Sequence, residues 1–190
     1  MTAGISLPGF GSRASGLWLT LFMLAPTILP ALSSTTTVEV LYASEDKPLD
    51  RVVALYHRAH RYLYVAVYGL SNSGAVEAPV AAKKRGVDVR IMTDRERLND
   101  PKQRAAINTL RLAGIPVRVN QHDGLIHMKQ VVMDDEVNAS GAMNHTTSGN
   151  RYHDERPDVI TDKAITAKTR DKFLAMWNDQ DRYQPRSEGR

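Results

Sequence analysis

The sequence predicts an α/β fold in which a mixed central β-sheet is flanked by helices on both faces. Strand-like segments alternate with helical segments over the first two-thirds of the chain, as in sheets whose faces are covered by helices. Two strand-like segments in the last third lie close together in the sequence, so we expect them to pair as an antiparallel hairpin. The 190 residues, 42% of them hydrophobic and 24% charged, suit one globular domain of ordinary size.

The first strand, the first helix and the central strand are predicted between residues 38 and 70. Residues 38–43, VEVLYA, alternate and are β-branched, which predicts a strand. Residues 46–60 predict a helix, because Pro48 suits a first helical turn and the apolar side chains that follow share one face. Residues 61–70, RYLYVAVYGL, form a dense Val, Tyr and Leu run, so we expect a buried central strand there.

Two further helix–strand pairs are predicted after the central strand. Residues 72–86 predict a helix that Gly86 ends, with three basic residues in its last turn, and residues 87–94 predict the next strand. Residues 100–114 predict a helix that also ends in a glycine, and residues 115–121 predict the strand after it. In sheets of this kind the functional groups gather at the carboxyl ends of the strands.

The last third of the chain predicts a hairpin and one more strand. Residues 127–135 and 137–144 predict two strands that turn near Asp135 and Glu136. Residues 156–162 predict a further strand. We therefore expect the second half of the sheet to contain antiparallel neighbours.

The C-terminal region predicts a helix followed by a disordered tail. Residues 181–190 are expected to be disordered, which leaves residues 38–180 as the folded domain. Residues 163–179 predict an amphipathic helix, whose inner face is expected to carry Ile165, Phe173, Leu174 and Trp177.

The N-terminal segment differs from the rest of the sequence. In residues 1–33 the only charged side chain is Arg13, and the apolar run after it has the length of a signal peptide. Prolines interrupt this run, and it is short for a membrane span. We expect a signal peptide with cleavage near Ser33, a linker at residues 34–37, and a secreted or periplasmic protein. The alternative is an uncleaved N-terminal anchor.

Charge and cysteine content limit the chemistry. The formal net charge of +4 and the pI of about 9.4 are compatible with a polyanionic partner. The chain has no cysteine, which excludes disulfides, thiolate metal sites and cysteine nucleophiles.

One short segment places reactive side chains together. His127 and Lys129 would point to the same side of a strand, and a hairpin would bring Asn144 back towards them. Gly141 would allow close backbone approach at this point. An imidazole, an ammonium and an amide suit a phosphate group better than a metal ion. The alternative is an ordinary polar strand face.

These residues carry a resemblance to a known family. His127-x-Lys129-x4-Asp134, followed after six residues by Gly141-Ala142-Met143-Asn144, resembles the HKD motif of the phospholipase D superfamily. The resemblance is to the small bacterial nuclease branch and covers roughly residues 38–180. It implies a phospholipase D/nuclease-like fold and a non-specific endonuclease acting on DNA, with RNA as a second substrate. A phospholipase D acting on lipids and a degraded polyanion-binding module are the alternatives.

The resemblance implies a mechanism that uses no metal or cofactor. One motif histidine attacks phosphorus, and a second, from another motif, protonates the leaving oxygen. The first must be neutral and the second protonated, which a coupled pair of histidines provides near neutral pH. This chain contains one motif, so the resemblance implies a homodimer with the active site on its two-fold axis.

The resemblance also assigns individual roles. Glu155 would orient the imidazole, and Asp134 would support the turn of the motif. Ala142 stands where the family usually has serine, and the lost hydrogen bond would weaken phosphate binding by roughly 0.5–1.5 kcal/mol. The residues expected in catalysis are His127, Lys129, Asp134, Asn144 and Glu155. Those expected to bind substrate are Lys129, Gly141 and Asn144.

Other histidines and tyrosines are expected to be structural. His122, His145 and His153 have no spacing typical of a metal site. His145, directly after Asn144, is expected in a solvated loop. The tyrosines of residues 61–70 are expected in the core, although one at the strand end could border the cleft.

Overall fold

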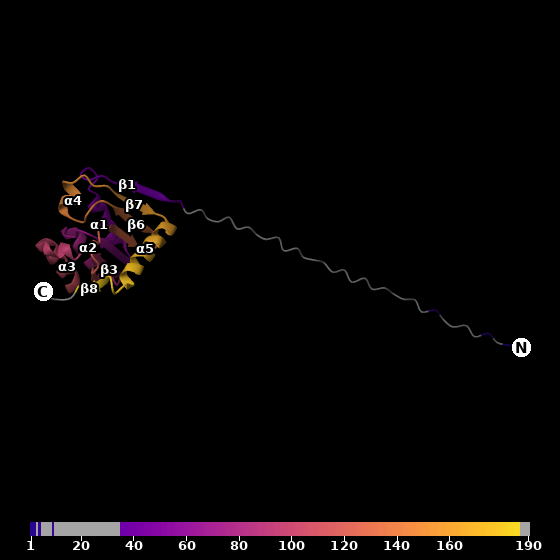
Figure 1. Ribbon diagram of the computed structural model, residues 1–190. Helices are drawn as coiled ribbons and strands as arrows, with labels where there is room; N and C mark the ends of the chain where they lie inside the picture. Colours follow the sequence, from indigo (N-terminus) through magenta and orange to yellow (C-terminus); the bar gives the residue numbers. More distant parts are fainter. Residues whose placement is uncertain (3, 5–8, 10–34, 187–190) are drawn as a thin grey trace. The chain divides into compact units, whose positions relative to one another are not determined.

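The computed structural model describes residues 1, 2, 4, 9 and 35–186, and its folded part is built on an eight-stranded sheet (Figure 1). The strand order is β1-β7-β6-β5-β2-β3-β4-β8. The β2–β3 and β3–β4 pairs are parallel and the other neighbours are antiparallel, which confirms the predicted mixed sheet. The strands are β1 (Thr37–Val40), β2 (Tyr62–Val67), β3 (Asp88–Thr93), β4 (Val117–Asn120), β5 (Lys129–Met133), β6 (Val137–Gly141), β7 (Pro157–Thr161) and β8 (Tyr183–Pro185).

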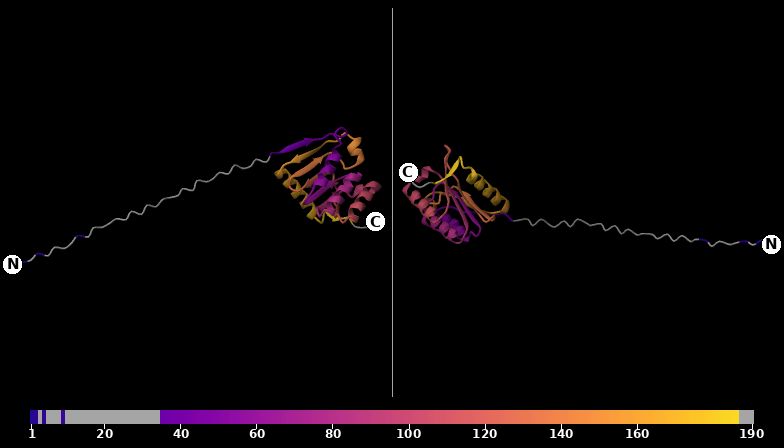
Figure 2. Two further views of the ribbon diagram at one scale, coloured as in Figure 1. Left: turned by 180° about the vertical axis from the view of Figure 1, so that it is seen from behind. Right: turned by 90° about the horizontal axis from the view of Figure 1, so that it is seen from below.

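Helices cover both faces of the sheet, as predicted (Figure 2). Helices α1 to α3 pack on one face and the long helix α5 on the other. The helices are α1 (Pro48–Arg58), α2 (Ser73–Lys84), the 3-10 helix η1 (Glu96–Asn99), α3 (Pro101–Leu112), α4 (Thr147–Arg151) and α5 (Lys163–Asn178).

Strand β2 is the buried centre of the sheet, because both of its faces are covered. Leu63, Val65 and Val67 belong to the core beneath α1 to α3. Tyr62 and Tyr64 belong to the second core beneath α5, and all six residues of β2 are buried. A strand covered on both sides needs apolar side chains at every position, which explains the unbroken apolar run in the sequence.

The helix boundaries follow the local signals in the sequence. Asn72 and Asp100 cap α2 and α3 with their side-chain oxygens. Gly86 and Gly114 follow the two helices with positive φ angles of 90° and 75°. Pro48 is the first residue of α1, as predicted.

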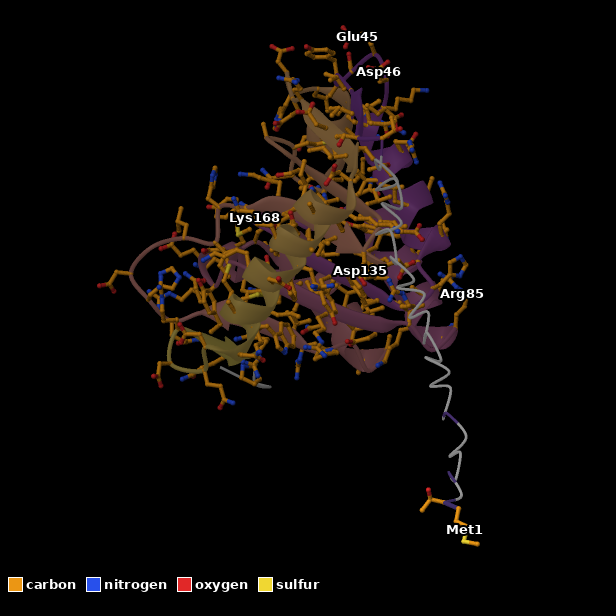
Figure 3. All side chains as sticks on the ribbon, turned by 90° about the vertical axis from the view of Figure 1, so that its right-hand side faces the viewer. Met1, Glu45, Asp46, Arg85, Asp135 and Lys168 are labelled. Atoms are coloured by element: carbon orange, nitrogen blue, oxygen red, sulfur yellow. The ribbon has the colours of Figure 1, made fainter. Side chains whose placement is uncertain are left out.

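The predicted hairpin is formed by β5 and β6. Asp134 and Asp135 make the turn with φ angles of 57° and 59°, in the left-handed region that aspartate tolerates better than most residues. Asp135 is marked at this turn in Figure 3. The prediction that β5 begins at His127 is wrong, because the strand begins at Lys129.

Three sequence predictions near the chain ends are corrected. The tail is not wholly disordered, because β8 pairs with β4 and the N–H of Arg186 donates to the carbonyl of Val117 at 2.9 Å. Thr37, predicted in the linker, belongs to β1. Ile165 is 41% exposed, because the buried surface of α5 is concentrated in its C-terminal half, at Phe173, Met176 and Trp177. The predicted signal peptide, apart from residues 1, 2, 4 and 9, lies outside the described residues.

Candidate active site

The candidate site lies where β2 ends and β5 begins. These strands are antiparallel, so Lys129 at the start of β5 pairs with Val67 at the end of β2. The N–H of Tyr68 donates to the carbonyl of Met128 at 2.9 Å and joins the two segments. Because β3 and β4 run parallel to β2, their carboxyl ends lie at the same edge. The site therefore occupies the edge of the sheet where the fold class predicts functional groups.

His127 and Lys129 are in direct contact. The Nζ atom of Lys129 lies 3.1 Å from each ring nitrogen of His127 and donates to the His127 carbonyl at 2.9 Å. His127 is exposed, whereas Lys129 is only 8% exposed. Burial lowers the pKa of Lys129 below its usual value. The negative charge of Glu155 acts in the opposite direction and offsets part of this shift. The pair thus presents an exposed imidazole beside a largely buried lysine.

The loop before His127 is held by two polar residues at the ends of β3 and β4. The buried carboxylate of Asp94 accepts hydrogen bonds from the backbone of Ile126 at 2.7 Å and of Glu96 at 2.9 Å. The side chain of Asn120 donates to the Gly124 carbonyl at 2.6 Å. Sequence reasoning missed both anchors, since they lie far from the motif in the chain. The hydrogen bonds of Asp94 and Asn120 hold the backbone before His127 in a loop that precedes β5.

The aromatic ring of Tyr68 packs against both His127 and Lys129. Its ring centroid lies 5.0 Å from that of His127, and the Lys129 Nζ lies 5.6 Å from the same centroid. The carbonyl of Tyr68 accepts from the amide of Gln103, which is fully buried and also donates to Thr93. The structure therefore supports the sequence expectation that a strand-end tyrosine borders the site. The buried support beneath it was not predicted.

Asn144 approaches from the segment that follows β6. Its side-chain oxygen accepts a hydrogen bond from the N–H of Gly69 at 2.9 Å. A Cβ atom at Gly69 would lie 3.1 Å from Asn144 Cγ, so this close contact favours glycine. The contact places Asn144 beside the end of β2, as the hairpin prediction required. The oxygen is engaged by this bond, and the NH2 group of the same amide is a donor that suits a phosphate oxygen.

Gly141 and Ala142 contribute backbone and space. A Cβ atom at Gly141 would lie 2.3 Å from the carbonyl oxygen of Arg156 on the neighbouring chain segment. Gly141 therefore serves close packing against β7, and its predicted contact with substrate stays a prediction. Ala142 is exposed, so the absence of a serine hydroxyl at this position creates no buried cavity.

Asp134 lies at the other end of β5 from Lys129 and acts on the fold. Its carboxylate accepts three backbone hydrogen bonds, from His60, Arg61 and Tyr62, at 2.8, 2.8 and 3.0 Å. These bonds join the hairpin turn to the start of β2. The geometry agrees with the expected support of the motif and gives Asp134 no contact with the reacting groups.

Glu155 is positioned to influence the charge of Lys129 more than the orientation of the His127 ring. Its side chain is 13% exposed and lies 3.7 Å from His153 Nδ1. In the described part of the chain it makes no hydrogen bond to His127, so the predicted orienting role stays a prediction. Its negative charge acts on Lys129.

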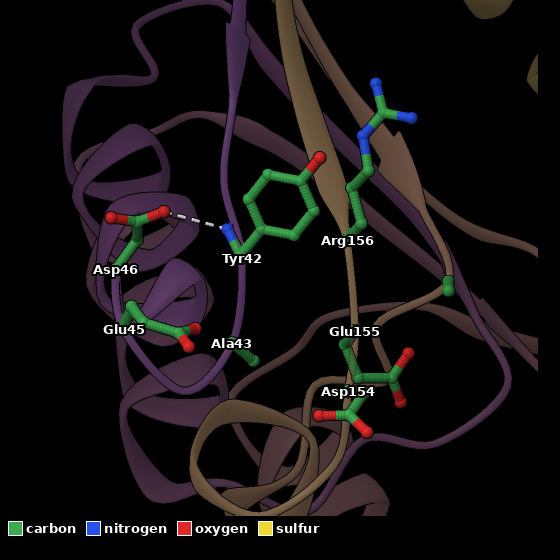
Figure 4. A pocket seen from close by; sticks show the side chains of 8 residues that line it. Tyr42, Ala43, Glu45, Asp46, Asp154, Glu155 and Arg156 are labelled. Carbon is green, nitrogen blue, oxygen red and sulfur yellow. Dashed lines mark hydrogen bonds between the residues drawn. The ribbon is translucent and has the colours of Figure 1, made fainter.

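Glu155 also borders a cleft of about 630 Å³, which we name the acidic cleft. Figure 4 places two carboxylates on one wall and two on the other, beside Tyr42 and Arg156. The four carboxylates belong to Glu45, Asp46, Asp154 and Glu155.

His145 is buried and not solvated, which corrects the sequence prediction. Its Nδ1 lies 3.0 Å from the hydroxyl of Tyr56, and its backbone bonds to Gly69, Ser71 and Asn72. Burial lowers the pKa of His145 to about 4, so the ring is neutral at physiological pH. It supports the loop that carries Asn144.

We expect His145 to make the protein sensitive to mild acid. The unfolded ring takes up a proton below about pH 6.5, whereas the folded ring does so only near pH 4. The stabilising contribution is therefore present above pH 6.5 and is lost as the pH falls towards 4, by about 3 kcal/mol. Urea denaturation at several pH values should show that the free energy of unfolding depends less on pH in His145→Gln than in the wild-type protein. The same dependence of the free energy of unfolding on pH in the two proteins would contradict this assignment.

The described residues contain neither a metal-binding cluster nor a membrane-spanning helix. No group of three or more His, Asp or Glu side chains is arranged to hold a metal ion in this part of the chain. Among the same residues, none of the helices has the length and apolar character needed to cross a membrane.

The mixed sheet and the cluster of His127, Lys129 and Asn144 define an enzyme class, that of the phospholipase D superfamily. A family described as "Cardiolipin synthase, PLD-like domain" matches residues 52–177. The chain belongs to this family of PLD-like domains.

Curated relatives and solved structures agree with this assignment. The "Mitochondrial cardiolipin hydrolase" of Xenopus tropicalis is 29% identical over 72% of this chain and 64% of that protein. The "Phospholipase D" of Rickettsia bellii is 31% identical over 63% of this chain and 56% of that protein. The chain thus spans less than two thirds of these relatives. Nuc from Salmonella typhimurium, a phospholipase D family member, matches with a TM-score of 0.71 and 26% identity over 80% of this chain and 97% of that chain.

Proposed function

We propose that the protein is a metal-independent phosphodiesterase that hydrolyses nucleic acid, with DNA as the main substrate, through a covalent phosphohistidine. One observation carries the proposal. The exposed imidazole of His127 lies 3.1 Å from the ammonium of Lys129, at the strand edge that Asn144 also reaches. This arrangement offers a nucleophile together with charged and neutral donors for the oxygens of a phosphate.

The proposed reaction has two displacements at phosphorus. The neutral nitrogen of His127 forms a bond to phosphorus, and the bond to the leaving oxygen breaks. The His127 of a second chain, initially protonated, gives its proton to that oxygen. Now neutral, it takes a proton from water, whose oxygen attacks phosphorus and displaces the first His127. Lys129 and Asn144 stabilise the charge on the non-bridging oxygens in both steps.

The dimer is part of the proposal because each chain supplies one HKD motif. A single imidazole cannot be both unprotonated nucleophile and protonated acid in the first displacement. Two copies related by a two-fold axis would bring two identical imidazoles and two ammonium groups to one phosphate. The exposure of His127 leaves its ring accessible to a second chain.

Phospholipid hydrolysis is the second candidate function. It is favoured by the matched family, whose description names cardiolipin synthase, and by relatives named for cardiolipin hydrolysis and phospholipase D. The same displacement at phosphorus would serve either substrate. We favour nucleic acid because the chain is basic, and phosphate contacts dominate non-specific binding to such a polyanion. The signal-peptide pattern of residues 1–33 leads us to propose that the reaction takes place outside the cytoplasm.

A plasmid-nicking assay tests the proposal. We expect the protein to relax supercoiled DNA equally well with and without EDTA, and to lose activity steeply as salt concentration rises. The same preparation should release little choline from phosphatidylcholine vesicles. Loss of nicking on chelation would contradict the mechanism, and lipid hydrolysis without nicking would favour the second candidate.

A further inference from the structure

A second pocket, of about 600 Å³, lies beside the candidate site, and none of its residues has a role in the mechanism above. It opens between the segment that follows β2 and the segment that follows Asn144. Its walls are rich in hydroxyl groups, so we name it the hydroxyl pocket. Its main polar residues are Ser71, Ser73, Arg97, Lys102, Thr147 and Ser148.

The hydroxyl pocket is connected to the catalytic cluster through Tyr68. The guanidinium carbon of Arg97 lies 5.4 Å from the Tyr68 ring centroid, and the His127 ring centroid lies 5.0 Å from it. Ser71 lies two residues after Gly69, which binds Asn144, and its N–H donates to the His145 carbonyl at 3.1 Å. The ring of Tyr68 thus lies between a group bound in this pocket and a phosphate bound at His127.

The charge of the hydroxyl pocket suits an anion. Arg97 and Lys102 contribute two positive charges, and Asp100 contributes one negative charge through its 2.9 Å pair with Arg97. The side chain of Arg97 is 31% exposed beside its pair with Asp100, so its guanidinium can also meet a ligand oxygen. Lys102 is exposed, and within the described residues its ammonium makes no ion pair.

The acidic cleft, which contains the Glu155 charge that acts on Lys129, has the opposite charge. Its four carboxylates face a single positive side chain, Arg156. A polyanion that crosses the site would be repelled there and attracted to the hydroxyl pocket. The difference in charge therefore favours the hydroxyl pocket over the acidic cleft as the place for a neighbouring phosphate.

We infer that the hydroxyl pocket binds the phosphate next to the scissile phosphodiester of a nucleic-acid chain. This inference rests on the proposed function and adds a subsite to it. Lys102 and Arg97 supply charge, and the serine and threonine hydroxyls donate to the phosphate oxygens. Lys102 is then a residue that determines preference for substrates with consecutive phosphates.

Dinucleotide substrates provide the test. We would compare kcat/KM for thymidylyl-thymidine with kcat/KM for the same compound bearing a terminal phosphate at either end. The wild-type protein should prefer a phosphorylated form, and Lys102→Ala should reduce that preference about tenfold, since a hydrogen bond to a charged group is lost. Lys102→Arg should keep most of the preference. Lys168→Ala, which removes an exposed lysine from α5 on the other face of the sheet (Figure 3), should keep all of it.

An unchanged preference in Lys102→Ala, or an equal loss in Lys168→Ala, would overturn the subsite. A parallel comparison of cardiolipin, with two phosphates, and phosphatidylglycerol, with one, distinguishes the source of the second phosphate. If Lys102→Ala altered only the lipid preference, the assignment to nucleic acid would be overturned. Failure of the proposed function gives a different result, namely no hydrolysis of bis(para-nitrophenyl) phosphate by the wild-type protein.

Discussion

His127→Ala should reduce phosphodiester hydrolysis by at least about 10⁴-fold, because the nucleophile and the acid are both lost from a two-fold symmetric site. His127 is exposed and contacts the side chains of Lys129 and Tyr68 at the surface, so the variant should fold normally. Rapid quenching of the wild-type protein with labelled substrate should trap phosphate on His127. His57→Ala, a substitution at an exposed histidine on α1 outside the cluster, is the matched control and should retain both activity and the trapped adduct.

Mixing wild-type and His127→Ala chains tests the shared site directly. If the chains assort at random, about one quarter of the dimers at equal amounts contain two intact histidines. Activity should therefore fall to about one quarter when the chains are co-refolded, compared with one half for independent sites. A linear dependence on the wild-type fraction, or full activity of a monomer, would refute the dimeric mechanism. Retained DNA binding without any trapped phosphate would favour a degraded binding module.

Asp134→Asn should lower the free energy of unfolding by about 2–3 kcal/mol. Asparagine tolerates the positive φ of this position, so the backbone conformation is retained. One carboxylate oxygen becomes an NH2 group, which leaves a backbone donor at the start of β2 without its acceptor. Urea denaturation measures the loss, and kcat of the folded variant should stay close to the wild-type value.

Asp135→Asn is the matched control for this prediction. Asp135 is the neighbouring turn residue, also has a positive φ, and pairs with Arg61 and Arg170 at the partly exposed surface. Surface pairs contribute little, so its substitution should cost about 1 kcal/mol or less. A stable Asp134→Asn protein without activity would show instead that Asp134 acts in catalysis.

Much of the fold was predictable because its signals are local. The turn predicted near Asp135 and Glu136 and the glycines that end α2 and α3 each depend on adjacent residues. The last strand was missed for the opposite reason. Tyr183 to Pro185 form a strand only because β4 offers an unpaired edge, and that edge exists only in the folded sheet.

The candidate site shows the same division. The sequence by itself determined the family motif, since it contains His127, Lys129 and Asn144 at distinctive spacing. Only the tertiary structure decided how these groups are held. Asp94 and Asn120 fix the loop of His127, Tyr68 lies under it, and burial keeps His145 neutral.

The physical reason is the range of each interaction. Propensity, capping and turn geometry act between neighbours in the chain, whereas burial and charge depend on which distant segments the sheet brings together. Lys102 and Ser71 illustrate this, because no pattern relates them in the sequence and they share a pocket only after β2 and α3 are packed. The sequence therefore determined which residues form the candidate cluster, and the tertiary structure decided their support, their electrostatic surroundings and the surface beside them.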